Sequence, residues 1–226
     1  RDHRRGRRGQ ERRTPGSFAT RGEGSASMSD IDITSITASE ADVEEIAYLI
    51  AAAFNPLDVA AWLVADPEVR LHAMGGQFAI IAAHALEHGR IDMSSDGHGV
   101  AVWFDLTQPI PEPPQYSQRL QQVCGPHTPR FETLDEAFEQ HHPEEAHHHL
   151  AFLAVRPGFQ GRGIGSALLA CHHDELDADG IAGYVEASSH ANRALYARHG
   201  YADSGSLITL PDGPNLWPMW RRPHRS

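Results

Sequence analysis

A run of glycines between residues 155 and 166 is the segment of this sequence best suited to chemistry. Gly161, Gly163 and Gly165 alternate with other residues directly before an amphipathic stretch that predicts a helix. Glycine lets backbone N–H groups approach a ligand closely, and the start of a helix adds partial positive charge. The turn therefore suits a pyrophosphate group. A glycine-rich connection that binds no ligand is the alternative interpretation.

The turn differs from two common phosphate-binding loops. No Lys follows the glycines, and the chain contains no Lys at all, which excludes a Walker loop and Schiff-base chemistry. The spacing G-x-G-x-G also departs from the G-x-G-x-x-G pattern of dinucleotide-binding folds. Two elements must position the turn: an apolar strand over residues 149–155 before it and a helix over residues 164–178 after it.

Two segments carry a family resemblance. The pattern Q-x-x-G-x-G at residues 160–165 resembles the signature of the GNAT superfamily of acetyl-CoA-dependent N-acetyltransferases. Residues 186–201 resemble the second superfamily segment, with Asn192 and Tyr196 four positions apart and a closing Gly-aromatic pair. Within the superfamily, residues 51–54, 131–155 and 210–223 are similar to the puromycin N-acetyltransferase-like branch. The resemblance is weaker over residues 57–130.

The resemblance implies that acetyl-CoA binds as cosubstrate along the strand and the turn. Backbone groups of Leu153 and Val155 would line the pantetheine arm, and amides of residues 162–166 would hold the pyrophosphate, with a charge contact from Arg162. The N–H of Val155 would stabilise the oxyanion. The residues implied in cofactor binding are Leu153, Val155, Gln160, Gly161, Arg162, Gly163, Ile164, Gly165, Ser166 and Asn192.

Tyr196 and Glu186 are the candidate catalytic residues. The resemblance places Tyr196 near the thioester sulfur, where a phenol of ordinary pKa about 10 can protonate a departing thiolate. Glu186 shares one strand face with Tyr184 and Ser188, so its carboxylate could accept a proton from an ammonium group directly or through water. The alternatives are that Tyr196 is a packing residue and Glu186 a hydrogen-bonded structural acid.

The acceptor is expected to be a small-molecule amine. The resemblance to the puromycin N-acetyltransferase-like branch makes an antibiotic-like amine one candidate. Asp105, at the end of a strand, is a reserve candidate for binding it, and Trp217 with Trp220 could form an aromatic wall instead of packing in the core. We expect direct acetyl transfer, because neither Cys124 nor Cys171 has the His/Asn arrangement of a covalent nucleophile. A non-catalytic acyl-CoA-binding regulatory module is the alternative function.

The sixteen His residues raise a metal-binding hypothesis. Most of the clustered ones lie in residues 141–149, a tract that could bind Zn or Ni in isolation. The tract contains no H-E-x-x-H motif and no Cys, so we predict no metal site. His148 or His149 could still face the substrate, and His172 with His173 should serve packing and solubility. A His-rich metal-binding protein is the remaining alternative.

The secondary-structure pattern predicts an α/β (α+β) fold. The resemblance specifies a mixed, mostly antiparallel sheet flanked by helices and splayed at its central parallel strand pair, formed by residues 149–155 and 181–187. Pro218 suggests that the last strand lies at a sheet edge or bulge. Other strands are expected over residues 31–36, 90–93, 100–104, 207–210 and 216–220. A helix is expected over residues 43–54, with Ser39 and Asp42 as a capping pair. Residues 57–88 are expected to form short helices broken at Asp66-Pro67 and at Gly75-Gly76. Further helices are expected over residues 116–123, 131–140 and 191–199.

Composition and charge set the context. The 226 residues carry a net charge of -11, although residues 1–27 hold eight Arg against three acids and so are positive. An acidic domain repels phosphate backbones, so we expect no nucleic-acid partner. We predict a disordered extension over residues 1–28 and one catalytic domain over residues 29–226, with residues 105–147 as an insertion or lid. Two Cys and no apolar span predict a cytoplasmic protein without membrane contact; a homodimer is compatible with the sequence.

Overall fold

A single mixed sheet organises the protein, for which we describe a computed structural model over residues 31–36 and 42–224. Its strands are β1 (Ile33–Ile36), β2 (Gly89–Ser94), β3 (Gly99–Asp105), β4 (His147–Val155), β5 (Ala182–Ala187), β6 (Tyr201–Asp203), β7 (Ile208–Thr209) and β8 (Asn215–Arg221). They follow the order β1-β2-β3-β4-β5-β8-β6, with β7 paired to β8. Only β4 and β5 pair in parallel within this set.

The parallel pair is short. β4 and β5 pair from His147 opposite Ala182 to His149 opposite Tyr184, and their later residues have no such pairing. The sheet therefore splays beyond His149, which confirms the predicted fold class: a mostly antiparallel sheet that opens at its central parallel pair.

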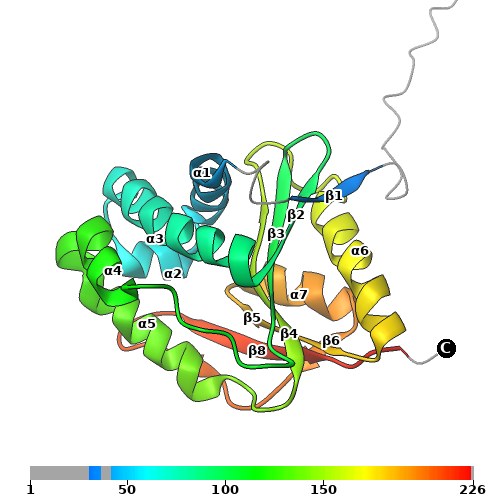
Figure 1. Cartoon of the computed structure of the whole chain (residues 1–226). Helices are drawn as coiled ribbons and strands as arrows, with labels where there is room; N and C mark the ends of the chain where they lie inside the picture. The colour runs from blue at the N-terminus through cyan, green and yellow to red at the C-terminus, as the bar shows by residue number, and fades with distance from the viewer. Residues whose placement is uncertain (1–30, 37–41, 225–226) are drawn as a thin grey trace, which may run out of the picture.

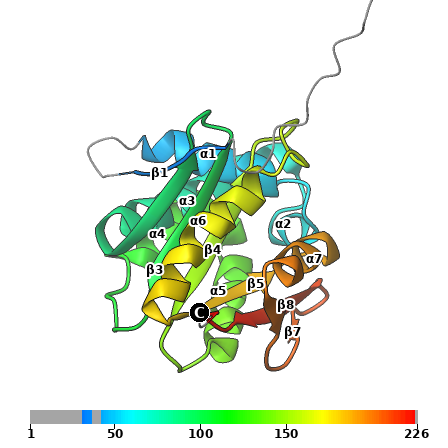
Figure 2. The ribbon, with the colours of Figure 1, turned by 90° about the vertical axis from the view of Figure 1, so that its right-hand side faces the viewer.

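Helices cover both faces of the sheet (Figures 1 and 2). α1 (Val43–Phe54) and α3 (Pro67–His88) pack on one face near β3 and β4, and α2 (Asp58–Leu63), α4 (Tyr116–Cys124) and α5 (Thr128–His141) lie on the same side. α6 (Ile164–Asp179) covers the other face. α7 (His190–Arg198) follows β5. Each face has its own apolar core, with Phe78 and Phe131 on the first side and Trp103 and Leu168 on the α6 side.

Helix boundaries follow capping chemistry. Asp42 caps α1, because its carboxylate accepts hydrogen bonds from the amides of Glu44 and Glu45 at 3.1 and 3.0 Å. Asp66 caps α3 in the same way, and Pro67 occupies its first turn. Ser39, the other predicted capping residue, lies outside the described residues, as does the predicted extension over residues 1–28.

The predicted break at Gly75-Gly76 is wrong, because α3 continues through both glycines as a helix of 22 residues. Gly76 faces α4 so closely that a Cβ atom there would lie 2.5 Å from the Cβ of Val123. A Cβ at Gly75 would meet only Ala51, at 4.0 Å. The second glycine therefore serves helix–helix contact and does not end the helix.

The prediction that Pro218 marks a sheet edge is also wrong, since β8 lies between β5 and β6. Pro218 sits opposite Glu186, and its carbonyl accepts the amide of Ser204 at 2.8 Å. In an antiparallel strand the N–H and the carbonyl of one residue lie on the same side, so the N–H that Pro218 lacks would also face the β6 side. The position opposite it comes just after β6 has ended at Asp203. The strand β6 itself was not predicted from the sequence.

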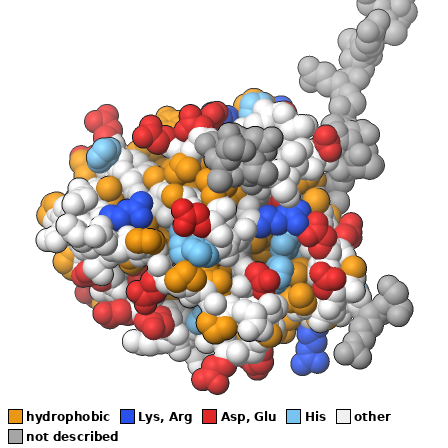
Figure 3. All heavy atoms as spheres, viewed as in Figure 1, with side chains coloured by type: hydrophobic (Ala, Val, Ile, Leu, Met, Phe, Trp, Pro, Cys, Tyr) orange, Lys and Arg blue, Asp and Glu red, His pale blue; other side chains and the backbone are white. Residues whose placement is uncertain are grey.

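The surface agrees with the acidic composition. Figure 3 shows acidic side chains scattered over the face viewed in Figure 1, with basic ones gathered at a few places. No helix within residues 31–36 and 42–224 combines the length and the apolar character that crossing a bilayer requires.

Candidate active site

Two cavities lie where the sheet splays. The larger, which we call the turn cavity, has a volume of about 580 Å³ and is bounded by the end of β4, the glycine turn, the start of α6 and α7. Most of the residues predicted to bind the cofactor line it: Leu153, Val155, Gln160, Gly161, Gly163, Ile164, Gly165, Ser166 and Asn192. Arg162 is the predicted residue that is not in this wall.

The turn presents backbone amides to the turn cavity. Gly158, Gly161 and Gly163 have φ values of 86°, 75° and 88°, a region that favours glycine. Gly163 is the N-cap of α6, so the first amides of that helix have no partner within the helix. The side chain of Gln160 donates to the carbonyl of Val155 at 3.3 Å and ties the turn to the end of β4. The result is a cradle of amides at a helix N-terminus, which suits an anion.

The amide of Val155 faces the opening. Arg156 donates its amide to the carbonyl of His98 at 2.8 Å, on the β3 side. Successive amides of a strand point in opposite directions, and Gly99 with Val155 forms a non-hydrogen-bonded pair. The N–H of Val155 therefore points away from β3, toward the side where β5 has diverged.

The side chain of Arg162 engages the turn itself. Its guanidinium lies 4.9 Å from the ring centroid of Phe159 and donates to the carbonyl of Gly158 at 3.0 Å. These contacts brace the turn. A charge contact between this side chain and a ligand stays a prediction.

Tyr196 and Asn192 stand on α7 where the two cavities meet. Ser189 caps this helix by accepting the amide of Asn192 at 3.1 Å, and the Asn192 side chain donates to Ser188 at 3.0 Å. Tyr196 is 6% exposed, and burial, with a further contribution from the charge of Glu186, raises the pKa of its phenol. Tyr196, Asn192 and Phe54 belong to the walls of both cavities.

The second cavity, which we call the apolar cavity, has a volume of about 250 Å³. Aromatic side chains provide much of its wall: Phe54, Phe78, Phe104, Tyr116, Phe138, Phe152 and Tyr196. Trp217 and Trp220 are absent from the wall, and so is Asp105, whose carboxylate accepts hydrogen bonds from Thr107 and lies 3.4 Å from His148. The predicted roles of these three residues in the acceptor site therefore have no support from their positions.

Glu186 reaches the apolar cavity together with His149. The carboxylate of Glu186 is 6% exposed and lies 2.8 Å from Nε2 of His149, while its other oxygen is 4.0 Å from Nδ1 of His142. Burial alone would raise the pKa of Glu186, but the charges and hydrogen bond of His149 and His142 outweigh burial and hold that pKa below its usual value. Burial also lowers the pKa of His142 to about 4. Glu186 is therefore a carboxylate at neutral pH, with a histidine held against it.

Polar residues of α3, α4 and α5 in the wall of the apolar cavity were not predicted from the sequence. Gln77, Tyr116 and Asp135 line it and bond to one another. Asp135 lies between the apolar Leu134 and Phe138, and all three residues line the cavity. An acid among apolar positions at helical spacing was the available signal.

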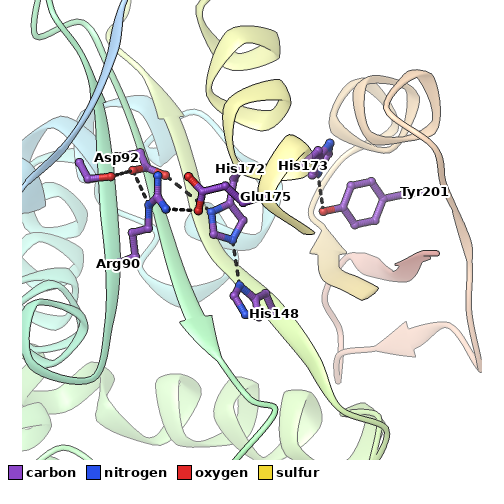
Figure 4. Close-up of polar contacts among 8 residues, drawn as sticks. Arg90, Asp92, His148, His172, His173, Glu175 and Tyr201 are labelled. Carbon is purple, nitrogen blue, oxygen red and sulfur yellow. Dashed lines mark hydrogen bonds and ion pairs between the residues drawn. The ribbon is translucent and has the colours of Figure 1, made fainter. Parts of the chain in front are cut away.

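His148, His172 and His173 lie on the α6 side of the sheet. Nδ1 of His148 lies 3.0 Å from Nε2 of His172, and His172 lies 3.9 Å from the buried carboxylate of Asp92 (Figure 4). The ring of His172 also stacks on Trp103, with 4.1 Å between the ring centroids. Burial lowers the pKa of His172 and of His173 to about 3, so both are neutral packing residues. Within the described residues, no three His, Cys, Asp or Glu side chains form a group suited to a metal ion.

Comparisons with known proteins agree with this geometry. Residues 133–203 match the model of the acetyltransferase (GNAT) domain family. A Corynebacterium glutamicum structure, named histone acetyltransferase HPA2 and related acetyltransferase, is similar at 25% identity and TM-score 0.58, covering 86% of this chain and 98% of that one. Arylalkylamine N-acetyltransferase 2 from Aedes aegypti has the same fold at 15% identity and TM-score 0.53, covering 85% and 99%.

The matched segment runs from α5 to β6 and includes the glycine turn, Glu186 and Tyr196. The resemblance to the puromycin N-acetyltransferase-like branch stays a prediction. The likeness over residues 133–203 to the acetyltransferase (GNAT) domain supports acyltransferase activity.

Proposed function

We propose that the protein transfers the acetyl group of acetyl-CoA directly to the amine of a small molecule. The observation that carries the proposal is the position of Tyr196, which belongs to the walls of both the turn cavity and the apolar cavity. One cavity is bounded by backbone amides at a helix N-terminus, and the other is mostly apolar. A donor and an acceptor can therefore approach the same phenol from two sides.

The residues of the turn cavity fit acetyl-CoA. The amides of residues 163–166 and the glycines of the turn offer donors to a pyrophosphate, and the opening beside Leu153 and Val155 continues from them toward Tyr196. When bound, acetyl-CoA supplies an activated acetyl thioester. The amide of Val155, free of the β3 ladder, is our candidate donor to the developing oxyanion.

His149 and Glu186 supply the base. An amine must lose a proton to attack, and His149 can accept that proton while the Glu186 carboxylate stabilises the imidazolium that forms. Because its pKa is lowered, the carboxylate of Glu186 is a weak proton acceptor. It is better suited to stabilise a protonated His149 than to act as the base itself. The predicted role of Glu186 thereby becomes that of one member of a pair.

Tyr196 supplies the acid. Its raised pKa keeps the phenol protonated, so it can donate its proton to a leaving thiolate. Cys124 and Cys171 do not line either cavity, and burial raises the pKa of the Cys124 thiol to about 12. Direct transfer without a covalent intermediate on the chain is the mechanism that fits.

A regulatory module that only binds acyl-CoA has no use for the apolar cavity or for the His149–Glu186 pair. The test is CoA release from acetyl-CoA across a panel of aminonucleosides, arylalkylamines, polyamines, amino acids and peptides. Tyr196→Phe should lower kcat by about 100-fold or more and leave CoA affinity unchanged. The matched control is Tyr201→Phe: this ring lies 5.8 Å from Tyr196, but its hydroxyl bonds to His173 on the α6 side. CoA binding without turnover on any amine would favour the regulatory module.

A further inference from the structure

The apolar cavity has a polar group in its wall that the acetyl-transfer chemistry does not use. Asp135 on α5 accepts a hydrogen bond from the hydroxyl of Tyr116 at 2.8 Å, and Gln77 donates to the same hydroxyl at 3.1 Å. All three side chains line the cavity, and they come from α5, α4 and α3. These are polar side chains set into a wall made mostly of Phe, Leu, Ile and Ala.

The position of Asp135 along α5 separates it from the reacting end. His142, the C-cap of α5, lies 4.0 Å from Glu186. Asp135 precedes His142 by seven residues, a separation of about 10 Å along a helix axis. The cavity therefore has carboxylates in two places: Glu186 beside His149, and Asp135 about two helical turns away.

The Asp135 carboxylate has no cation near it. Among residues 31–36 and 42–224, no Arg or His nitrogen lies within 4.0 Å of it. Burial, opposed by the Tyr116 hydrogen bond and assisted by the nearby Glu132, raises the pKa of Asp135 to about 6. At neutral pH this side chain is thus a partly desolvated anion, and the nearby Glu132 is also acidic. A bound cation would offset the cost of that burial.

We propose that the acceptor has an apolar body with two basic groups, of which one is acetylated beside His149 and Glu186 and the other binds the carboxylate of Asp135. This inference rests on the proposed function and names its substrate class. Aromatic rings along the cavity contact the apolar body, and the hydroxyl of Tyr116 orients the carboxylate. Asp135 then selects the substrate without taking part in proton transfer.

Linear terminal diamines and alkyl monoamines of matched lengths test the proposal, with CoA release as the readout. The wild-type protein should prefer diamines in kcat/KM by about 10- to 100-fold, the usual value of a hydrogen bond to a charged group. The preference should appear mainly in KM and should peak at one chain length, because the two carboxylates are a fixed distance apart. This arm needs no variant, so it holds even if a substitution impairs folding.

Asp135→Asn keeps the size of the side chain and can still accept from Tyr116, but it removes the charge. It should lower kcat/KM for diamines to the level of monoamines. Glu132→Gln is the control, because it removes an exposed carboxylate one turn earlier on the same helix and should leave the preference intact. Equal use of diamines and monoamines by the wild type, or a preference that survives Asp135→Asn, would overturn the inference. CoA release with neither series nor with any other amine would instead overturn the proposed function.

Discussion

Single side chains acquire their chemistry here from partners that are distant in sequence. Glu186 lies near the end of a strand that also carries buried Tyr184 and Val185, and alone it would be an ordinary acid near a strand end. It meets His149 because β4 and β5 are paired in parallel only up to that point. The same splay places Tyr196 between the two cavities.

The His149–Glu186 pair should act as one unit. We expect Glu186→Gln and His149→Gln each to lower kcat by about 100-fold at neutral pH, and the double variant to lose little more than either single one. The loss should shrink as pH rises, because a larger fraction of the amine is then already neutral. Steady-state kinetics of the four proteins across pH measures this, and a kcat for Glu186→Gln within twofold of the wild type would rule out the pair.

At the scale of elements, local patterns in the sequence predicted the helices and strands, but they did not predict contacts between residues far apart in the sequence. The glycine turn, α6, β5 and α7 follow from a contiguous stretch whose periodicity and motifs agree with each other, and the structure places them as expected. The prediction at Gly75-Gly76 was wrong because a glycine pair is equally compatible with a break in a helix and with a close contact between two helices. Only the position of Val123 on α4, 47 residues later, distinguishes the two.

The two glycines of α3 should respond in opposite ways to alanine. The methyl group of Gly75→Ala would make only an ordinary van der Waals contact with Ala51. The substitution should therefore stabilise the protein by about 1 kcal/mol, because alanine has the higher helix propensity. Gly76→Ala should destabilise it by about 1–3 kcal/mol, because the new methyl collides with Val123 and forces α3 and α4 apart. Urea unfolding of both variants measures the difference. Equal stabilisation by both substitutions would refute the packing role of Gly76.

For the whole molecule, the two halves of the site differed in how well the sequence predicted them. The half near the turn comes mainly from residues 153–166 and 189–198, where short motifs and a family resemblance are informative. The apolar half is assembled from α1 to α5, α7, β3, β4, β5 and β8, and its polar residues Gln77, Tyr116 and Asp135 belong to no motif. Asp135 and Tyr116 meet across 19 residues and two helices, so their contact required the tertiary structure.

In the proposed function, amides at the start of α6 bind the pyrophosphate of CoA. Gly163 and Gly180 make a matched pair for testing it, because they cap the two ends of α6 with φ values of 88° and 69°. Alanine at either position should strain the backbone by about 1–2 kcal/mol, but only Gly163→Ala disturbs the amides of the turn.

Isothermal titration calorimetry with CoA, on the wild type and both variants, is the most direct measurement. We predict one CoA bound per chain, an affinity at least about tenfold weaker in Gly163→Ala, and an affinity in Gly180→Ala equal to that of the wild type. No binding by the wild type, or equal weakening by the two substitutions, would contradict the account.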